Sequence, residues 1–96
     1  MKAAKVDANQ GEIVQALRGI GCSVQPLHTV GKGCPDLLVG FKGLNVALEV
    51  KQGEAKRNDL TPDQVKWHDN WRGQVAVVCS VEEATGLMWK LVGDCR

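Results

Sequence analysis

The chain has 96 residues, of which 44% are hydrophobic and 24% are charged, and its formal net charge is +1. This composition is ordinary for a globular protein and excludes a disordered or low-complexity chain. No apolar run approaches the ~20 residues of a membrane-spanning helix, so we expect no membrane association through such a segment. The length predicts one domain over residues 1–96. The near-neutral charge gives no argument of its own for a polyanionic partner.

The cysteines and the N-terminus indicate the compartment. Residues 1–9 are polar and charged, which is unlike a secretory signal. The cysteines are widely spaced, without a Cys-x-x-Cys pair, so we expect reduced thiols in a cytoplasm and neither a disulfide framework nor a structural zinc site. These cysteines are Cys22, Cys34, Cys79 and Cys95.

The first predicted helix begins at a cap, Asp7 or Asn9, and ends near Arg18. Its apolar stripe has helical spacing and predicts a buried face made of Ile13, Ala16, Leu17 and Ile20. Glu12 lies one turn before Ala16, at the margin of that stripe. It either leans toward the sheet or serves only to favour the helix dipole.

The next segment predicts a strand over residues 23–30, in which Pro26 indicates an edge position or an irregularity. A glycine-rich loop, residues 31–35, follows it. Two apolar runs then flank a tight turn at Lys42-Gly43, which predicts a β-hairpin. The alternation places one wholly apolar face toward the core: Leu37, Val39, Phe41, Leu44, Val46, Leu48 and Val50.

The other face of this hairpin carries charge. A two-residue turn at Lys42-Gly43 places Asp36 directly across from Glu49, and facing side chains in such a pair have Cβ atoms roughly 5 Å apart. Lys51 lies two residues beyond Glu49 and so shares its face. A shift of one residue would send these charges into the core, so the register is strongly constrained. The alternative is an ordinary solvated face that ends in a Glu-x-Lys sequence.

The second half of the chain begins with a polar stretch, residues 52–60, that predicts an exposed loop. Thr61-Pro62-Asp63-Gln64 then has the pattern of a capping box, and the helix it opens should end near residues 72–73. We expect its inner side to carry Val65, Trp67, His68 and Trp71. Residues 74–79 predict a buried strand. A second capping box at Ser80 opens a final helix to about Val92, with Ala84, Leu87, Met88, Leu91 and Val92 buried.

The charged face of the hairpin suits a hard divalent cation. Mg²⁺ commonly takes one or two carboxylates and keeps several waters. Such an ion polarises a phosphoryl oxygen and lowers the pKa of a bound water. Lys51 would either orient or deprotonate that water, or stabilise negative charge on the phosphate. Cys34 adjoins the site, but no histidine is linked to it in the sequence, which disfavours thiol catalysis. Basic residues near the hairpin, among them Lys32, suit a polyanionic substrate or form a plain solvated surface.

These residues resemble a known family. Gly33-Cys34-Pro35-Asp36, Glu49-Val50-Lys51 and Leu60-Thr61-Pro62-Asp63-Gln64 are similar to the motifs of the PD-(D/E)XK nuclease superfamily, and most closely to its VRR-NUC branch, the virus-type replication-repair nucleases. The resemblance covers nearly the whole chain. It implies an α/β fold with a restriction-endonuclease-like core, in which elements follow the order α-β-β-β-α-β-α and helices flank a mixed sheet.

The resemblance also implies roles for individual residues. Asp36 and Glu49, with the carbonyl of Val50, would hold Mg²⁺ or Mn²⁺, and no organic cofactor is expected. Lys51 would be the catalytic lysine. Glu12 matches a first-helix glutamate that supports the metal site. Gln64 matches a glutamine that approaches the site, although its capping box explains its position equally well.

The minimal members of this branch imply a DNA endonuclease selective for branched DNA such as Holliday junctions, working as a homodimer in the cytoplasm of a bacterium or a phage-infected host. Trp67 and Trp71 are one helical turn apart and form either a partner-facing patch or part of the core. A nuclease acting on DNA ends or flaps shares the same catalytic centre and remains an alternative. So does a non-catalytic nucleic-acid-binding module, which the three charges argue against.

Overall fold

The computed structural model describes residues 8–94, which form one four-stranded sheet and the helices around it. The elements follow the order α-β-β-β-α-β-α, as expected, with a short 3₁₀ helix after the third strand. Their bounds are α1 Gln10–Gly19, β1 Ser23–Pro26, β2 Leu37–Phe41, β3 Leu44–Val50, η1 Glu54–Lys56, α2 Pro62–Asn70, β4 Val75–Val78 and α3 Val81–Asp94. The cap alternative at Asp7 and the cysteine Cys95 lie outside the described residues.

The sheet is mixed, with strand order β1-β2-β3-β4. β1 and β2 pair antiparallel, as do β2 and β3, whereas β4 joins β3 in parallel. The central hairpin has the predicted register, with Leu37 opposite Leu48 and Phe41 opposite Leu44. Its turn residues Lys42 and Gly43 both have positive φ, +50° and +85°. Two such residues make a turn whose twist matches that of the flanking strands, which keeps the register in place.

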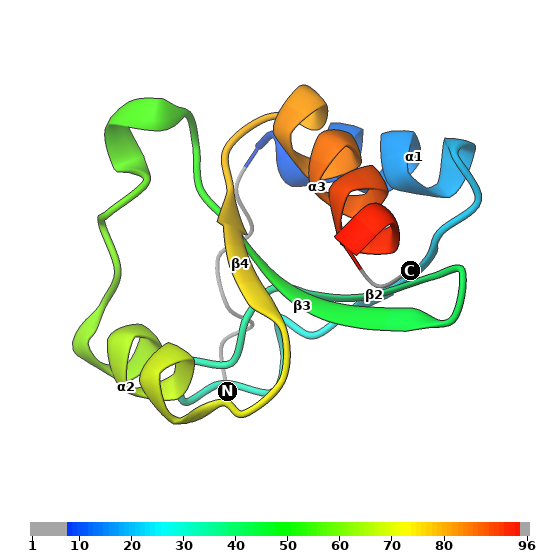
Figure 1. The fold of residues 1–96 in the computed structure, drawn as a ribbon. Helices are drawn as coiled ribbons and strands as arrows, with labels where there is room; N and C mark the ends of the chain where they lie inside the picture. The colour runs from blue at the N-terminus through cyan, green and yellow to red at the C-terminus, as the bar shows by residue number, and fades with distance from the viewer. Residues whose placement is uncertain (1–7, 95–96) are drawn as a thin grey trace.

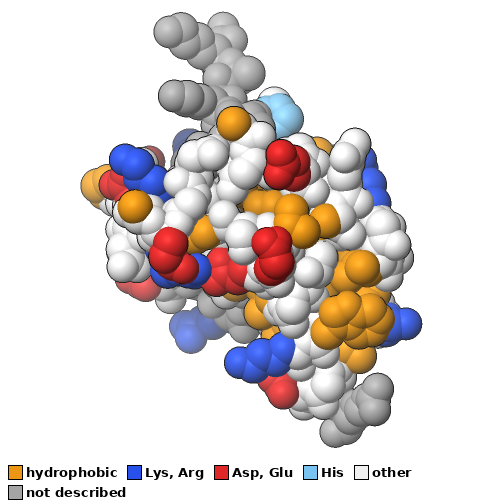
Figure 2. All heavy atoms as spheres, turned by 90° about the horizontal axis from the view of Figure 1, so that it is seen from above, with side chains coloured by type: hydrophobic (Ala, Val, Ile, Leu, Met, Phe, Trp, Pro, Cys, Tyr) orange, Lys and Arg blue, Asp and Glu red, His pale blue; other side chains and the backbone are white. Residues whose placement is uncertain are grey.

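Within the described residues, α-helices lie on both faces of the sheet, two on one face and one on the other (Figure 1). α1 and α3 lie side by side on one face, and α2 lies on the opposite side near the ends of β3 and β4 (Figure 1). The core fills the space between the sheet and the α1–α3 layer, and it contains the apolar face of the hairpin as predicted. Its largest fully buried side chains include Ile13, Leu17, Leu37, Leu48 and Met88. Seen from above, this helical layer carries acidic side chains across its middle and most basic ones at its margin (Figure 2).

Three expectations about the elements were wrong. β1 ends at Pro26 instead of residue 30, because the chain turns there through a hydrogen bond from Val30 N to Leu27 O. β4 is an edge strand, so Val75 to Val77 are only half-buried. The inner side of α2 is not apolar, since none of its residues is buried and Val65 and Trp71 are exposed. α2 is therefore held by its polar residues.

The predicted helix starts are confirmed. Thr61 Oγ1 accepts a hydrogen bond from Gln64 N, and the Gln64 side chain accepts one from Thr61 N, which completes the capping box of α2. Ser80 Oγ accepts from Glu83 N at the start of α3. Along the polar stretch 52–60, η1 replaces the expected plain loop. Within the described part of the chain, no helix has the length and apolar character to cross a membrane.

Candidate active site

The two predicted carboxylates and the lysine meet at the C-terminal end of β3. Asp36 immediately precedes β2, and its Oδ2 accepts a hydrogen bond of 2.7 Å from Val50 N. Glu49 lies on β3 and is 2% exposed, because α2 covers this end of the strand. Lys51 follows β3 directly, where its backbone N–H donates to Val78 O at 3.0 Å. The hairpin therefore holds two acids and an amine in one region.

Gln64 connects this cluster to α2. Its Nε2 donates to Glu49 Oε2 at 3.3 Å, and its Oε1 accepts from Lys51 Nζ at 3.1 Å. The same Oε1 also accepts from Thr61 N at 2.9 Å. The two alternatives for this residue, helix cap and site residue, are thus combined in one side chain. The cap orients the amide, and the oriented amide contacts both a carboxylate and the lysine.

His68 is a site residue that the sequence analysis did not find. It lies one helical turn after Gln64, and its Nε2 is 3.5 Å from Glu49 Oε1. Burial lowers the pKa of His68, as does the positive charge of Lys51, while Asp69 opposes them. The signal was available, because residues at positions i and i+4 share one face of a helix. Gln64 and His68 together line Glu49 from the same side.

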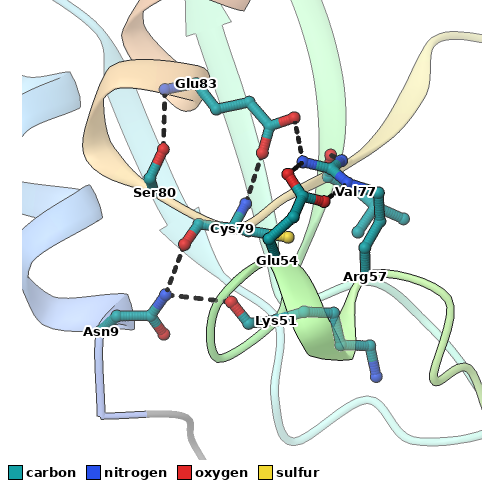
Figure 3. Close-up of polar contacts among 8 residues, drawn as sticks. All are labelled: Asn9, Lys51, Glu54, Arg57, Val77, Cys79, Ser80 and Glu83. Atoms are coloured by element: carbon teal, nitrogen blue, oxygen red, sulfur yellow. Dashed lines mark hydrogen bonds and ion pairs between the residues drawn. The ribbon is translucent and has the colours of Figure 1, made fainter.

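Asn9 anchors the backbone of the site. It is the N-cap residue of α1, yet its side chain makes no capping bond. Instead its Nδ2 donates to Lys51 O at 3.0 Å and to Cys79 O at 3.2 Å, which joins the ends of β3 and β4 (Figure 3). The amino group of Lys51 points away from this network. No local pattern predicted these contacts, since their partners lie far along the chain.

The segment between β3 and α2 is fastened by Arg57. Its guanidinium forms an ion pair with Glu54 and another with Glu83 Oε2 at 2.6 Å, and it donates to Val77 O at 3.3 Å. Glu83 Oε1 in turn accepts from Cys79 N at 2.7 Å (Figure 3). The hydrogen bonds that Arg57 donates to Glu54 and Glu83 raise the pKa of Arg57. The loop that leads to α2 is thereby tied to β4 and to the start of α3.

The glycine-rich loop packs tightly on α2. Gly33 has φ +81°, and a Cβ atom at this position would lie 2.2 Å from Asp63 O and 2.8 Å from Gln64 N. No side chain fits there without moving the first turn of α2. The loop that leads to Asp36 therefore contacts the helix turn that carries Gln64. This contact sets the distance between the two halves of the site.

The pKa of the Cys34 thiol is affected by both acids of the site. Burial raises the pKa of its thiol, and the negative charges of Glu49 and Asp36 raise it further. A protonated thiol is a poor nucleophile, which agrees with the expectation against thiol catalysis. Both carboxylates thus create a negative potential at one point. Cys22, Cys34 and Cys79 are free thiols, as expected.

The donor set fits a hard divalent cation at Asp36 and Glu49. Two carboxylates in one place favour a cation between them, and Mg²⁺ accepts such a pair when waters complete its shell. Residues 8–94 contain no group of three His, Cys, Asp or Glu side chains arranged to hold a metal. Glu12 is exposed in the first turn of α1, and its predicted support of the metal site stays a prediction.

Comparison with known proteins agrees with this arrangement. No family model matches the sequence, and no curated protein matches it. A solved structure described as a VRR_NUC domain superposes with a TM-score of 0.68 and 27% sequence identity, over 86% of this chain and 97% of that one. This match supports assignment of the chain to the VRR-NUC family. The same match supports a nuclease domain in general terms.

The VRR-NUC assignment covers the elements that build the site. The match spans most of the chain, and the α-β-β-β-α-β-α order and mixed sheet are those expected for this fold. Within this VRR-NUC chain, Gln64, His68 and Gly33 all connect α2 to the hairpin. The position of α2 therefore determines the surroundings of Glu49.

Proposed function

We propose that the protein is a metal-dependent DNA endonuclease that hydrolyses phosphodiester bonds at the end of β3. The observation that carries this proposal is the convergence of Asp36, buried Glu49 and Lys51, with Gln64 hydrogen-bonded to both Glu49 and Lys51. Asp36 and Glu49 would hold Mg²⁺ or Mn²⁺, with the carbonyl of Val50 as a further ligand. When bound, the ion would polarise the phosphate and lower the pKa of a water.

The protein's own residues orient the reaction. Lys51 presents its ammonium group beside the carboxylates, where it would stabilise the negative charge that grows on the phosphate oxygens or orient the attacking water. Gln64 holds that group through the 3.1 Å hydrogen bond to its Nζ. Gln64 orients the carboxylate of Glu49 through its hydrogen bond to Oε2, and His68 Nε2 lies 3.5 Å from Oε1. Partners of this kind commonly tune a metal-binding carboxylate.

The finer part of the proposal is that the enzyme is selective for branched DNA and works as a homodimer. The resemblance of the chain to the minimal VRR-NUC proteins supports selectivity for branched DNA such as Holliday junctions. It also supports a homodimer, in which two active sites would cut opposite strands. Glu12 is exposed in the first turn of α1, so the direct ligands we propose are Asp36, Glu49 and the carbonyl of Val50, with Glu12 as a supporting residue of the metal site.

One assay tests the enzymatic proposal. Purified protein is incubated with four-way junction, flap, linear duplex and single-stranded DNA in Mg²⁺, Mn²⁺ or chelator. We expect cutting that requires metal and is lost in Asp36→Asn and Lys51→Ala. Asp36→Asn retains an oxygen for the Val50 hydrogen bond, so its fold should persist. Binding without cutting under every metal condition would replace the nuclease by a binding module.

The substrate comparison and a sizing experiment test the finer part. Preferential cutting of the four-way junction supports branched-DNA selectivity, and a preference for flaps or ends would replace it by the end-directed alternative. Equal cutting of all DNAs would remove selectivity while leaving the nuclease in place. Sedimentation at micromolar concentration should give twice the 10.4 kDa chain mass. A monomer at that concentration would contradict paired incision.

A further inference from the structure

The side of α2 that faces away from Glu49 borders a groove. Its volume is about 480 Å³, and its lining residues are Lys32, Asp63, Lys66, Trp67, Asn70 and Trp71. This volume lies in the range of small-ligand pockets, about 300–1,000 Å³. Gln64 and His68 of the same helix contact Glu49, so the groove and the proposed active site lie on two sides of α2.

Two stacked indoles form one wall of the groove. The rings of Trp67 and Trp71 have centroids 4.6 Å apart and planes 17° from parallel. Trp71 nevertheless remains 49% exposed, and α2 has no buried residue. The pair therefore adds little to the core, although the two indoles stack on each other. An exposed aromatic surface is the feature on which nucleobases stack in proteins that bind single strands.

Two lysines give the groove its charge. Lys66 lies on α2, and Lys32 lies on the glycine-rich loop. The neighbouring Gly33 packs on the backbone of Asp63, so the loop that carries Lys32 is held close to α2. Asp63 offsets one of the positive charges, and the lining keeps a net positive charge. Ammonium groups beside an aromatic surface suit a nucleotide, whose base is apolar on its faces and whose phosphates are anionic.

We propose that this groove binds an unpaired nucleotide of the DNA substrate, with its base stacked on Trp71 and its flanking phosphates on Lys32 and Lys66. The inference rests on the proposed nuclease function and specifies its substrate: DNA with unpaired nucleotides that reach the outer side of α2. The two lysines favour DNA over a second copy of the chain, because they attract phosphates and because interfaces between proteins are depleted in Lys.

The test measures DNA binding without cutting. Asp36→Asn protein in chelator is titrated by fluorescence anisotropy with a blunt duplex, with the same duplex bearing a single-stranded thymidine overhang, and with oligothymidine. Adding Trp71→Ala should weaken binding of the overhang and of oligothymidine about tenfold, within the range for loss of one stacked base, and should leave the blunt duplex within about twofold. Trp71→Phe should retain most of the affinity.

Trp89 provides the matched control. It is 51% exposed, lies on α3 and packs on Phe41, on the other side of the sheet. Trp89→Ala should leave the ratio of overhang to duplex affinity unchanged. Equal losses for all three DNAs with Trp71→Ala, or no loss, would overturn the proposal. So would conversion of a dimer to a monomer by Trp71→Ala, which would assign the groove to a second copy of the chain.

A second measurement covers the case in which Trp71→Ala fails to fold. Oligothymidine should quench the tryptophan fluorescence of the protein, and Trp71→Phe should reduce that quenching while Trp89→Phe preserves it. Unchanged quenching in Trp71→Phe would overturn the proposal. The outcome for the groove can be distinguished from the outcome for the nuclease proposal. If Trp71→Ala weakens binding of the overhang and of oligothymidine but the wild type cuts no DNA, only the nuclease proposal is rejected. If the wild type cuts DNA in the presence of metal but Trp71→Ala weakens binding of all three DNAs equally, only the groove proposal is rejected.

Discussion

The side-chain amide of Gln64 donates a hydrogen bond to the carboxylate of Glu49 across 3.3 Å. The two residues belong to different elements, since Glu49 lies at the end of β3 and Gln64 in the first turn of α2. The amide oxygen of Gln64 also receives the N–H of Thr61 and the amino group of Lys51. One side chain thus joins helix capping to the arrangement of the charged cluster, and substitutions can separate the two functions.

Gln64→Ala should lower cleavage more than its effect on stability explains. It removes the contacts to Glu49 and Lys51, and loss of such a supporting partner typically costs about 10- to 100-fold in metal affinity or activity. Thr61→Ala is the matched control, because it removes the Oγ1 cap, at about 1 kcal/mol, and leaves the Gln64 side chain in place. Cleavage rates and thermal unfolding of both variants measure the difference. Equal cleavage rates would mean that Gln64 acts only as a cap.

Gly33→Ala should disturb the site more than Gly31→Ala. Both glycines have positive φ, +81° and +79°, so both alanines carry a left-handed strain of about 1–2 kcal/mol. Only the Cβ of residue 33 meets the backbone of α2, whereas nothing lies within 4 Å at residue 31. Urea unfolding should show the larger loss of stability for Gly33→Ala, and cleavage should fall with it. Matching losses in the two variants would show that the close approach of the loop to α2 has no consequence.

Mn²⁺ should stabilise the protein through Asp36 and Glu49. A ligand at 100 times its Kd raises the free energy of unfolding by about 2.7 kcal/mol, which a thermal melt detects without any DNA. Asp36→Asn should abolish the shift, and His68→Ala should weaken Mn²⁺ binding because it releases one side of the Glu49 carboxylate. Glu12→Gln should leave the shift in place. An effect of Glu12→Gln as large as that of Asp36→Asn would add Glu12 to the ligand set.

The Glu54–Arg57 pair should stabilise the fold more at neutral pH than in acid. The hydrogen bond from Arg57 lowers the pKa of Glu54 below its ordinary value of 4.5. A carboxyl group whose pKa is lowered by folding contributes stability above its unfolded-state pKa, and this contribution is lost as the pH falls through the folded-state pKa. Glu54→Gln should therefore lower the melting temperature at pH 7 and have a smaller effect at about pH 3.

Asp59→Asn is the control for this prediction. Asp59 belongs to the same segment, but its contact with Lys56 spans 4.0 Å and both side chains are mostly exposed. Exposed pairs of this kind contribute little, so Asp59→Asn should leave the melting temperature almost unchanged at both pH values. A larger effect at pH 3 than at pH 7 for Glu54→Gln would contradict the assigned pKa direction.

The sequence by itself determined the parts of this protein that depend on local patterns. The turn at Lys42-Gly43 and the apolar alternation around it predicted the hairpin and its register, because turn conformation and a period of two leave one arrangement that buries the apolar face. That register placed Asp36 beside Glu49. The pattern from Thr61 to Gln64 likewise predicted the start of α2, since a capping box involves only neighbouring residues.

The tertiary structure alone decided which distant residues complete the site. Asn9 contacts Lys51 and Cys79, and Gly33 packs on the first turn of α2, although nothing in the local sequence names these partners. His68 was expected on the inner side of α2 but was given no role in the site, because its approach to Glu49 depends on how α2 packs against β3. The side of α2 that faces the sheet depends on how loop, helix and strand pack together, and packing is a property of the whole chain.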